Sequence, residues 1–264
     1  MRYPKLERLI KALLLVGLGV FLYGRIAGGT LTYYINERFA GYTLFAALGL
    51  LGVGLFYLFG QRDDDAHDQT HHDHAHHDHG HHDHGHHDHG HSHGLSWGGA
   101  LLVAMPVILG LLVAPQPLGV AALANREVSL SVENSALPAS VRLSGQRSPR
   151  ERNILEWWQT FQATADYDTL VGQEAQVVGF VFRDGRYGED VFMATRFVVS
   201  CCVADAVVVA MVVQWPETAA LENDQWVEVE GVFVRSGLEN WRPPILAATR
   251  VTPVDIPAQP YLYP

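Results

Sequence analysis

The sequence has few of the residues on which disulfide frameworks, nucleic-acid sites and enzyme active sites depend. Two cysteines among 264 residues cannot build a disulfide framework. Acidic residues exceed basic ones by ten, and residues 125–264 contain no lysine, so nucleic acid is an unfavourable partner. The chain carries no recognisable nucleophile–base constellation or phosphate-binding loop. We therefore expect a protein that is not an enzyme and binds no nucleic acid.

Long apolar segments dominate the N-terminal part of the chain. Three of them, at about 9–27, 41–60 and 95–114, are long enough to cross roughly 30 Å of hydrocarbon. We predict two transmembrane helices within residues 1–60 and a third within 95–115, in a multi-pass protein of the inner or plasma membrane. The interiors of these segments lack the ionisable residues that normally mark an ion path, so the lipid-embedded part is predicted to be an accessory and not a conduit.

The basic residues predict the orientation of these helices. Four of them, Arg2, Lys5, Arg8 and Lys11, precede or enter the first segment, which places the N-terminus in the cytoplasm. Alternation then puts the loop 61–94 in the cytoplasm and everything after residue 115 on the exoplasmic side. The triplet Ala122-Leu123-Ala124 is similar to a signal-peptidase site, but we interpret it as linker and expect no cleavage.

All fifteen histidines lie between residues 67 and 93, in a loop built from repeats of the type HHDHG. The loop has no apolar residues with which to form a core, so we predict that it is disordered without a ligand. Neutral imidazole binds zinc, nickel and copper, and protonation below about pH 6.5 abolishes that binding. The alternative is a solvated spacer produced by repeat expansion. The predicted metal ligands are His71, His72, His74, His76, His77, His79, His81, His82, His84, His86, His87, His89, His91 and His93.

The two cysteines are adjacent, at the end of the apolar run RFVVSCCVAD. In an extended strand, Cys201 and Cys202 would point to opposite faces and could share a metal ion only if the backbone turned there. They are either small apolar core residues or a thiolate site for metal or redox chemistry. Because this domain lacks histidine, a metal site here must use sulfur and oxygen, and we predict Cys201, Cys202 and Asp205 as its ligands. The flanking Arg196 and Asp205 could pair with one another, lower the thiol pKa or contact the partner, and a surface or interface ion pair is the default expectation for each.

The C-terminal part is predicted to be mainly β. Residues 116–149 are interpreted as linker with short strands at Val128–Val132 and Val141–Leu143, and residues 150–264 as the exoplasmic domain. A helix is expected over Arg150–Ala165, capped by Ser148 and packed through its apolar residues. The five strands expected after it indicate an OB-like five-stranded barrel with a helix on one side. They are Glu174–Arg183, Phe192–Cys201, Ala206–Val213, Gln225–Arg235 and Ile245–Pro253.

Several strings in the C-terminal half resemble one known family. These are GFVF at Gly179–Phe182, RFVVSCCVADA around the cysteines, VEVEGVFV at Val227–Val234 and PYLYP at Pro260–Pro264. The chain resembles the YcgQ-type family of predicted permease subunits. The resemblance implies a few membrane helices, a C-terminal double-cysteine domain of uncharacterised function, and a separately encoded multi-spanning permease as partner. It also implies a role in handling divalent metal, with zinc as the expected ion.

We therefore expect an integral membrane accessory subunit of a two-component permease. Its expected partners are the lipid bilayer, the permease and metal ions, with Zn²⁺ or another divalent transition metal bound but no tightly held cofactor. The alternatives are a membrane-tethered thiol redox protein, against which the absence of a C-x-x-C motif counts, and a metal-buffering protein.

Overall fold

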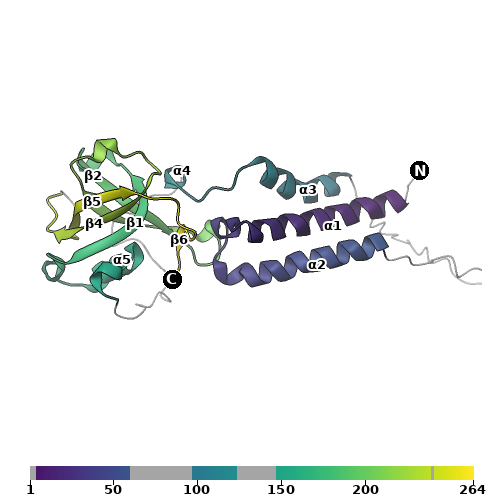
Figure 1. Cartoon of the computed structure of the whole chain (residues 1–264), viewed down its shortest axis with the longest axis horizontal. Coiled ribbons are helices and arrows are strands. Elements are labelled where there is room, and N and C mark those ends of the chain that lie inside the picture. The colour runs from purple at the N-terminus through teal and green to yellow at the C-terminus, as the bar shows by residue number, and fades with distance from the viewer. Residues whose placement is uncertain (1–3, 60–96, 124–146, 239–240) are drawn as a thin grey trace, which may run out of the picture. The chain divides into compact units, whose positions relative to one another are not determined.

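The computed structural model describes residues 4–59, 97–123, 147–238 and 241–264, which fall into two compact units. The first unit comprises residues 1–24 and 43–114, and the second comprises residues 25–42 and 115–264. The short connection between the first two helices thus belongs to the same unit as the C-terminal domain. Figure 1 shows the elements of each unit.

Three apolar helices form the described part of the first unit, namely α1 (Pro4–Ala27), α2 (Ala40–Phe59) and α3 (Trp97–Leu112). Two stretches, Leu6–Ala27 and Glu37–Phe59, are long and apolar enough to cross a membrane, which is consistent with a membrane protein. α3 contains 16 residues with Pro106 inside it, whereas the sequence predicted about twenty. At 1.5 Å per residue, α3 is about 24 Å long, shorter than a typical span.

Small residues let α1 and α2 pack closely. A Cβ atom on Gly54 of α2 would lie 2.7 Å from Val16 Cγ2, and one on Gly19 of α1 would lie 2.8 Å from Leu51 Cγ. In the same way, a Cβ atom on Gly110 of α3 would lie too close to the Phe21 ring of α1. The outward face of α2 leaves large side chains such as Phe45 and Phe56 exposed. This pattern of small residues at helix contacts and large apolar residues outside is typical of helices in lipid.

Five strands of the second unit form a barrel (Figure 1). Each is hydrogen-bonded to its neighbour in the order β1-β4-β5-β3-β2, and a further pairing of β1 with β2 closes the sheet. β3 and β5 pair in parallel, and the other four pairings within the barrel are antiparallel. The strands are β1 (Glu174–Phe182), β2 (Val191–Val198), β3 (Val207–Gln214), β4 (Trp226–Val234) and β5 (Ile245–Pro253).

Alternation of side chains explains why these segments are strands. In β4, Val227 and Val229 are fully buried while Glu228 and Glu230 between them stay partly exposed. β2 is buried along its whole length, as expected of a strand that pairs on both sides and is covered by other elements. The expected five-stranded barrel is confirmed, and β5 has the predicted bounds.

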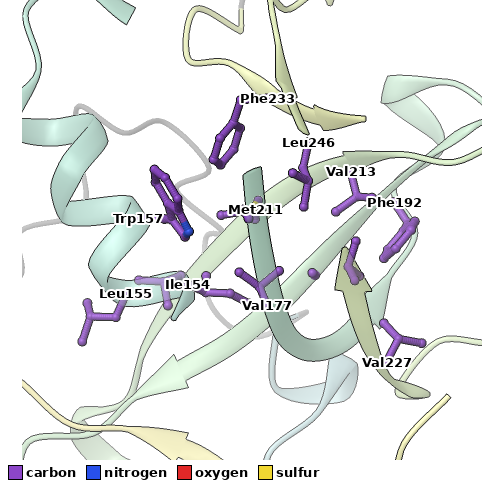
Figure 2. Close-up of a cluster of buried hydrophobic side chains, with 14 of the residues drawn as sticks. Ile154, Leu155, Trp157, Val177, Phe192, Met211, Val213, Val227, Phe233 and Leu246 are labelled. Carbon is purple, nitrogen blue, oxygen red and sulfur yellow. The ribbon is translucent and has the colours of Figure 1, made fainter. Parts of the chain in front are cut away.

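Helix α5 (Ile154–Ala163) closes one side of the barrel core (Figure 2). Trp157 is completely buried, and its ring meets the Phe233 ring of β4 edge-on, with centroids 4.6 Å apart. Phe161 packs against the same Phe233 ring at 5.5 Å. Aromatic residues bury large apolar areas, so this contact holds the helix to the sheet. The expectation that this helix packs through its apolar residues is thus met by Trp157, while Trp158 is partly buried against the same core.

The start of α5 differs from the prediction. Ser148 caps a short 3-10 turn at Pro149–Glu151, and Asn153 caps the α-helix itself, with its side chain accepting from Glu156 N at 3.0 Å. Both caps are capping boxes with glutamate three residues later, so the sequence contained two signals and the second one opens the helix. The short strands expected at 128–132 and 141–143 lie outside the described residues.

Short elements complete the second unit. Helix α4 (Val120–Leu123) follows the first unit, and the last strand, β6 (Tyr261–Leu262), pairs in parallel with the end of β2. The 3-10 turns that matter below are η1 (Thr30–Tyr33) and η2 (Glu37–Phe39) in the α1–α2 connection, and η6 (Val203–Asp205) after the cysteines. The remaining ones are η3 (Pro149–Glu151), η4 (Tyr167–Leu170), η5 (Gly185–Tyr187) and η7 (Thr218–Ala220).

Candidate dithiol site

The two cysteines lie in a turn and not in a strand. β2 was expected to reach Cys201 but ends at Val198, and the chain then folds back through η6. The Cys201 thiol donates to Cys202 Sγ at an Sγ–Sγ distance of 3.7 Å. Cys201 is exposed and Cys202 is half-buried, and neither forms a disulfide. The turn therefore places both sulfurs on one side of the backbone, the condition for sharing a single ion.

Asp205 holds this turn together. Its carboxylate accepts from Ser200 N at 3.1 Å and from Cys201 N at 2.7 Å. Slight burial alone would raise the pKa of Asp205, but hydrogen bonds from the Cys201 thiol and from the backbone amides of the turn outweigh it and lower the pKa. Asp205 is therefore ionised at neutral pH, when it anchors the turn.

The same carboxylate affects the neighbouring thiol. The side-chain hydrogen bond with Asp205, followed by the one with Cys202, raises the pKa of Cys201 from 9.0 to about 11. Cys201 is thus a thiol and not a thiolate at neutral pH. A cation that binds here must displace a proton, and the raised pKa leaves less of the thiolate that nucleophilic redox chemistry requires.

The α1–α2 connection lies against the cysteine turn within the same unit. Ile35 forms an antiparallel bridge with Cys202, Asn36 N donates to Cys201 O at 3.0 Å, and Val203 N donates to Tyr34 O at 2.9 Å. Residues 34–36 and 201–203 thus form a small two-stranded contact. The backbone on either side of both sulfurs is fixed by residues that are far away in the sequence.

Asn36 is the buried centre of this contact, with 1% of its surface exposed. Its side-chain amide donates to Ser200 O at 3.0 Å, and its side-chain oxygen accepts from Arg38 N at 3.0 Å. The second of these bonds caps η2, which leads directly into α2. One side chain therefore connects the entry to a membrane-type helix with the residue that precedes the cysteines.

Arg196 is buried and bonded to backbone carbonyls, so the surface or interface ion pair expected for it, with Asp205 as one possible partner, is not its arrangement. It is 6% exposed, and its guanidinium donates to Val178 O at 3.3 Å and to Gln259 O at 2.8 Å. The guanidinium also lies 5.0 Å from the Trp226 ring centroid. Burial lowers the pKa of Arg196 to about 10, against a smaller opposing effect of Tyr263. Arg196 thus fastens the C-terminal tail to β2 and does not act on the thiols.

The tail fastens the α1–α2 connection as well. The Tyr261 hydroxyl donates to Tyr33 O at 3.1 Å and accepts from Leu118 N at 2.9 Å. Gln259 also donates to the Glu37 carboxylate. Both segments that adjoin the apolar helices, residues 25–42 and 115–119, are therefore tied to the edge of the barrel beside the cysteine turn.

The comparisons with known proteins match nearly the whole chain. Residues 10–129 match the DUF1980 N-terminal domain, and residues 150–264 match the DUF1980 C-terminal domain, which includes both cysteines. The chain belongs to the DUF1980 family. Over 96 aligned residues, the chain is 22% identical to the UPF0703 protein YcgQ of Bacillus subtilis (strain 168). The alignment covers 36% of this chain and 34% of that relative. The predicted membership of the YcgQ-type family is thus confirmed.

Solved structures are only distantly similar to this DUF1980 protein. OBody AM3L09 and OBody AM2EP06, each bound to hen egg-white lysozyme, both align with 20% sequence identity and a TM-score of 0.24 over 33% of this chain. The two alignments cover 86% of the OBody AM3L09 chain and 84% of the OBody AM2EP06 chain. A TM-score this low does not assign the fold.

The predicted ligands of the DUF1980 chain fall into two groups. The structure brings Cys201, Cys202 and Asp205 together, with Asp205 bound to the turn's own amides. Within the described residues, no group of three or more His, Cys, Asp or Glu side chains is arranged to hold a metal ion. The fourteen histidines from His71 to His93 lie outside those residues.

The α1–α2 connection is the part of the site that sequence reasoning missed. Asn36 lies 164 positions from Ser200, and no local pattern indicates that contact. The one available signal was that asparagine before Glu37 is a typical helix cap, which accounts for its bond to Arg38 N but not for its burial.

Proposed function

We propose that this protein is a membrane-anchored accessory subunit of a two-component permease and that its Cys201–Cys202 dithiol binds a divalent metal ion, with zinc as the expected ion. Membership of the DUF1980 family and two helices of membrane-spanning length support the general assignment. The proximity of two free thiols carries the proposal of metal binding.

The distance between the sulfurs fits a tetrahedral site. Zinc–sulfur bonds of about 2.3 Å at tetrahedral angles separate two sulfurs by about 3.8 Å. The Sγ–Sγ distance is 3.7 Å, so both thiolates could bind one ion with little movement. No group of three or more His, Cys, Asp or Glu side chains in the described residues is arranged to hold an ion, so an ion bound by the two thiolates would keep positions open for exchange. An open coordination sphere suits transfer of the ion more than permanent storage.

The contacts of the α1–α2 connection support a third membrane crossing. This connection is hydrogen-bonded to the barrel, so the two lie on the same side of any membrane that α1 and α2 cross. The chain leaves α2 on the other side and must cross again before residue 115. α3 is the apolar helix described in that interval, and its backbone bonding continues to Val113, which donates to Leu109 O. The proposed topology puts the histidine loop in the cytoplasm and the dithiol outside.

An OB-like identity for the barrel is part of this proposal. The strand order that runs from β1 through β4, β5, β3 and β2 back to β1, with one helix against the core, is consistent with a five-stranded Greek-key barrel. The acidic balance of the domain disfavours binding of nucleic-acid phosphates, so we propose an interaction or metal-binding role and no enzymatic activity.

X-ray absorption at the zinc edge tests the metal proposal directly. The full chain, purified with one equivalent of Zn²⁺, should show two sulfur ligands near 2.3 Å and oxygen or nitrogen for the rest. The double variant Cys201→Ser/Cys202→Ser should lose the sulfur contribution, whereas deletion of residues 61–94 should keep it. A spectrum without sulfur in both the parent protein and the variant that lacks residues 61–94 would reject the dithiol site and leave a metal-buffering loop as the better function.

A membrane-impermeant maleimide tests the sidedness of the site. With the cysteines reduced and free of metal, intact cells should show labelling of Cys201 from outside. Labelling only after lysis would contradict the proposed topology.

The thiol redox alternative is disfavoured by the raised pKa of Cys201. It would require Cys201→Ser to abolish activity under metal-replete conditions.

A further inference from the structure

The contact between the α1–α2 connection and the cysteine turn depends on one buried side chain. Three hydrogen bonds join residues 34–36 to residues 200–203, two of which form the Ile35–Cys202 bridge, and Asn36 takes part in two of the three. At the same time, Asn36 caps the turn that leads into α2. A polar side chain buried to this degree is held in place because every group that it satisfies would otherwise be left unpaired.

We propose that Asn36 is a positioning residue that sets the geometry of the dithiol, and thereby its affinity for a thiophilic divalent cation, from the point where the chain enters α2. This inference rests on the proposed function. It adds the residue that sets the geometry of the site, namely an asparagine that bonds both to the cysteine turn and to the turn before α2.

The mechanism follows from which atoms are fixed. Ser200 O and Cys201 O are the carbonyls immediately before each cysteine, and both accept from Asn36. On the opposite side of the turn, Asp205 accepts from Ser200 N and Cys201 N. The backbone that orients the two sulfurs is thus held between Asn36 and Asp205. Loss of the Asn36 side chain removes the bond to Ser200 O and leaves only the backbone bond from Asn36 N to Cys201 O, so the 3.7 Å separation of the sulfurs is enforced less strongly.

Movement of α2 has a direct route to this turn. η2 ends at Phe39 and α2 begins at Ala40, so no flexible linker separates the capped turn from the helix. A shift of the first turn of α2 therefore displaces Arg38 N, to which the Asn36 side chain is bonded. The side-chain amide of Asn36 and its contact with Ser200 O move with it.

Cadmium binding to the full chain in detergent tests the inference. Cd²⁺ bound to thiolate gives an ultraviolet charge-transfer band that imidazole and carboxylate do not give, so the histidine loop does not obscure it. We expect Asn36→Ala to weaken Cd²⁺ binding by roughly tenfold or more, as expected from the loss of a buried hydrogen-bonding group. Asn36→Asp keeps the oxygen that caps η2 but loses the donor to Ser200 O, and it should weaken binding to a similar extent.

Asn153→Ala is the matched control, because Asn153 also caps a helix through its side-chain oxygen but does so at the start of α5. It should leave the affinity within about twofold of the parent value. If Asn36→Ala disturbs folding, seen as a large fall in its melting temperature, the comparison of Asn36→Asp with the parent decides the result.

The outcomes separate the two proposals. Unchanged Cd²⁺ affinity in both Asn36 variants, with the band still abolished by Cys201→Ser/Cys202→Ser, would overturn the positioning role and leave the metal site intact. Absence of the thiolate band in the parent protein would reject the metal site itself. An equal loss of affinity in Asn153→Ala would show that general destabilisation explains the effect, and this too would overturn the inference.

Discussion

Replacing Gly231 by alanine should destabilise the barrel by a predictable amount. Gly231 lies at the irregularity of β4, where the register with β5 shifts between Glu230 and Gly231. A Cβ atom there would lie 2.3 Å from Ala247 O and 2.9 Å from Ala248 Cα. Cβ atoms essentially never come closer than 3.0 Å to other heavy atoms, so the two strands must separate by at least the difference, about 0.7 Å.

That displacement sets the expected loss of stability. A ladder hydrogen bond of about 2.9 Å that lengthens by this much is effectively lost, and each such bond contributes about 1 kcal/mol. Overpacking of a well-packed sheet adds about 1–3 kcal/mol. We therefore expect Gly231→Ala to lower the free energy of unfolding by about 2–4 kcal/mol. At about 4 °C per kcal/mol, this lowers the melting temperature of the domain by about 8–16 °C.

Thermal unfolding of the full chain in detergent, followed by tryptophan fluorescence, measures this effect. Trp157 and Trp226 are both buried in the barrel unit and report its unfolding. Gly185→Ala is the control, because a Cβ at Gly185 meets nothing within 4 Å and its φ is not positive. It should leave the melting temperature unchanged or raise it slightly. The control is expected to change the melting temperature by no more than about 2 °C. A change as small as this for Gly231→Ala would contradict the close approach of β4 and β5.

Three further predictions concern the core, the thiol and the tail. Trp157→Ala should cost about 3–5 kcal/mol in the same unfolding assay, because it empties a fully buried site. Asp205→Asn replaces the carboxylate whose hydrogen bond with the Cys201 thiol is the largest cause of the raised pKa of Cys201, so alkylation of Cys201 by iodoacetamide at pH 8 should become faster, with its rising phase shifted from about pH 11 toward pH 9; an unchanged pH profile would contradict that hydrogen bond. Tyr261→Phe should raise the rate of limited proteolysis in residues 25–42, because two backbone hydrogen bonds to the hydroxyl are lost; an unaltered rate would mean that the tail does not hold the connection.

Local patterns made the barrel predictable. Val227 and Val229 alternate with glutamates, and the bounds of β5 were predicted as observed, because a half-buried strand has a period of two. The start of α5 was predicted one capping box too early, since Ser148 and Asn153 both precede a glutamate by three positions. The end of β2 could not be predicted, because Val199 continues the apolar run past the last paired residue.

The candidate site was predictable only in its sulfurs. The adjacency of Cys201 and Cys202 is visible in the sequence, but the turn that lets them face each other depends on the Asp205 carboxylate and on Asn36. A long-range contact through one buried amide leaves no periodic signal, because it involves a single position on each side. For the same reason, Arg196 was expected in an ion pair, whereas its partners are backbone carbonyls of β1 and of the tail.

The way in which residues 34–36 lie beside the cysteines has a practical consequence for fragment studies. A water-soluble piece that starts after residue 115 would retain both sulfurs but leave Val203 N and the carbonyls of Ser200 and Cys201 without their partners. Its titration curves and affinities would describe a relaxed turn that the intact chain does not contain. Grafting the segment Thr30–Phe39 onto such a piece is therefore the minimum addition for soluble work on the dithiol.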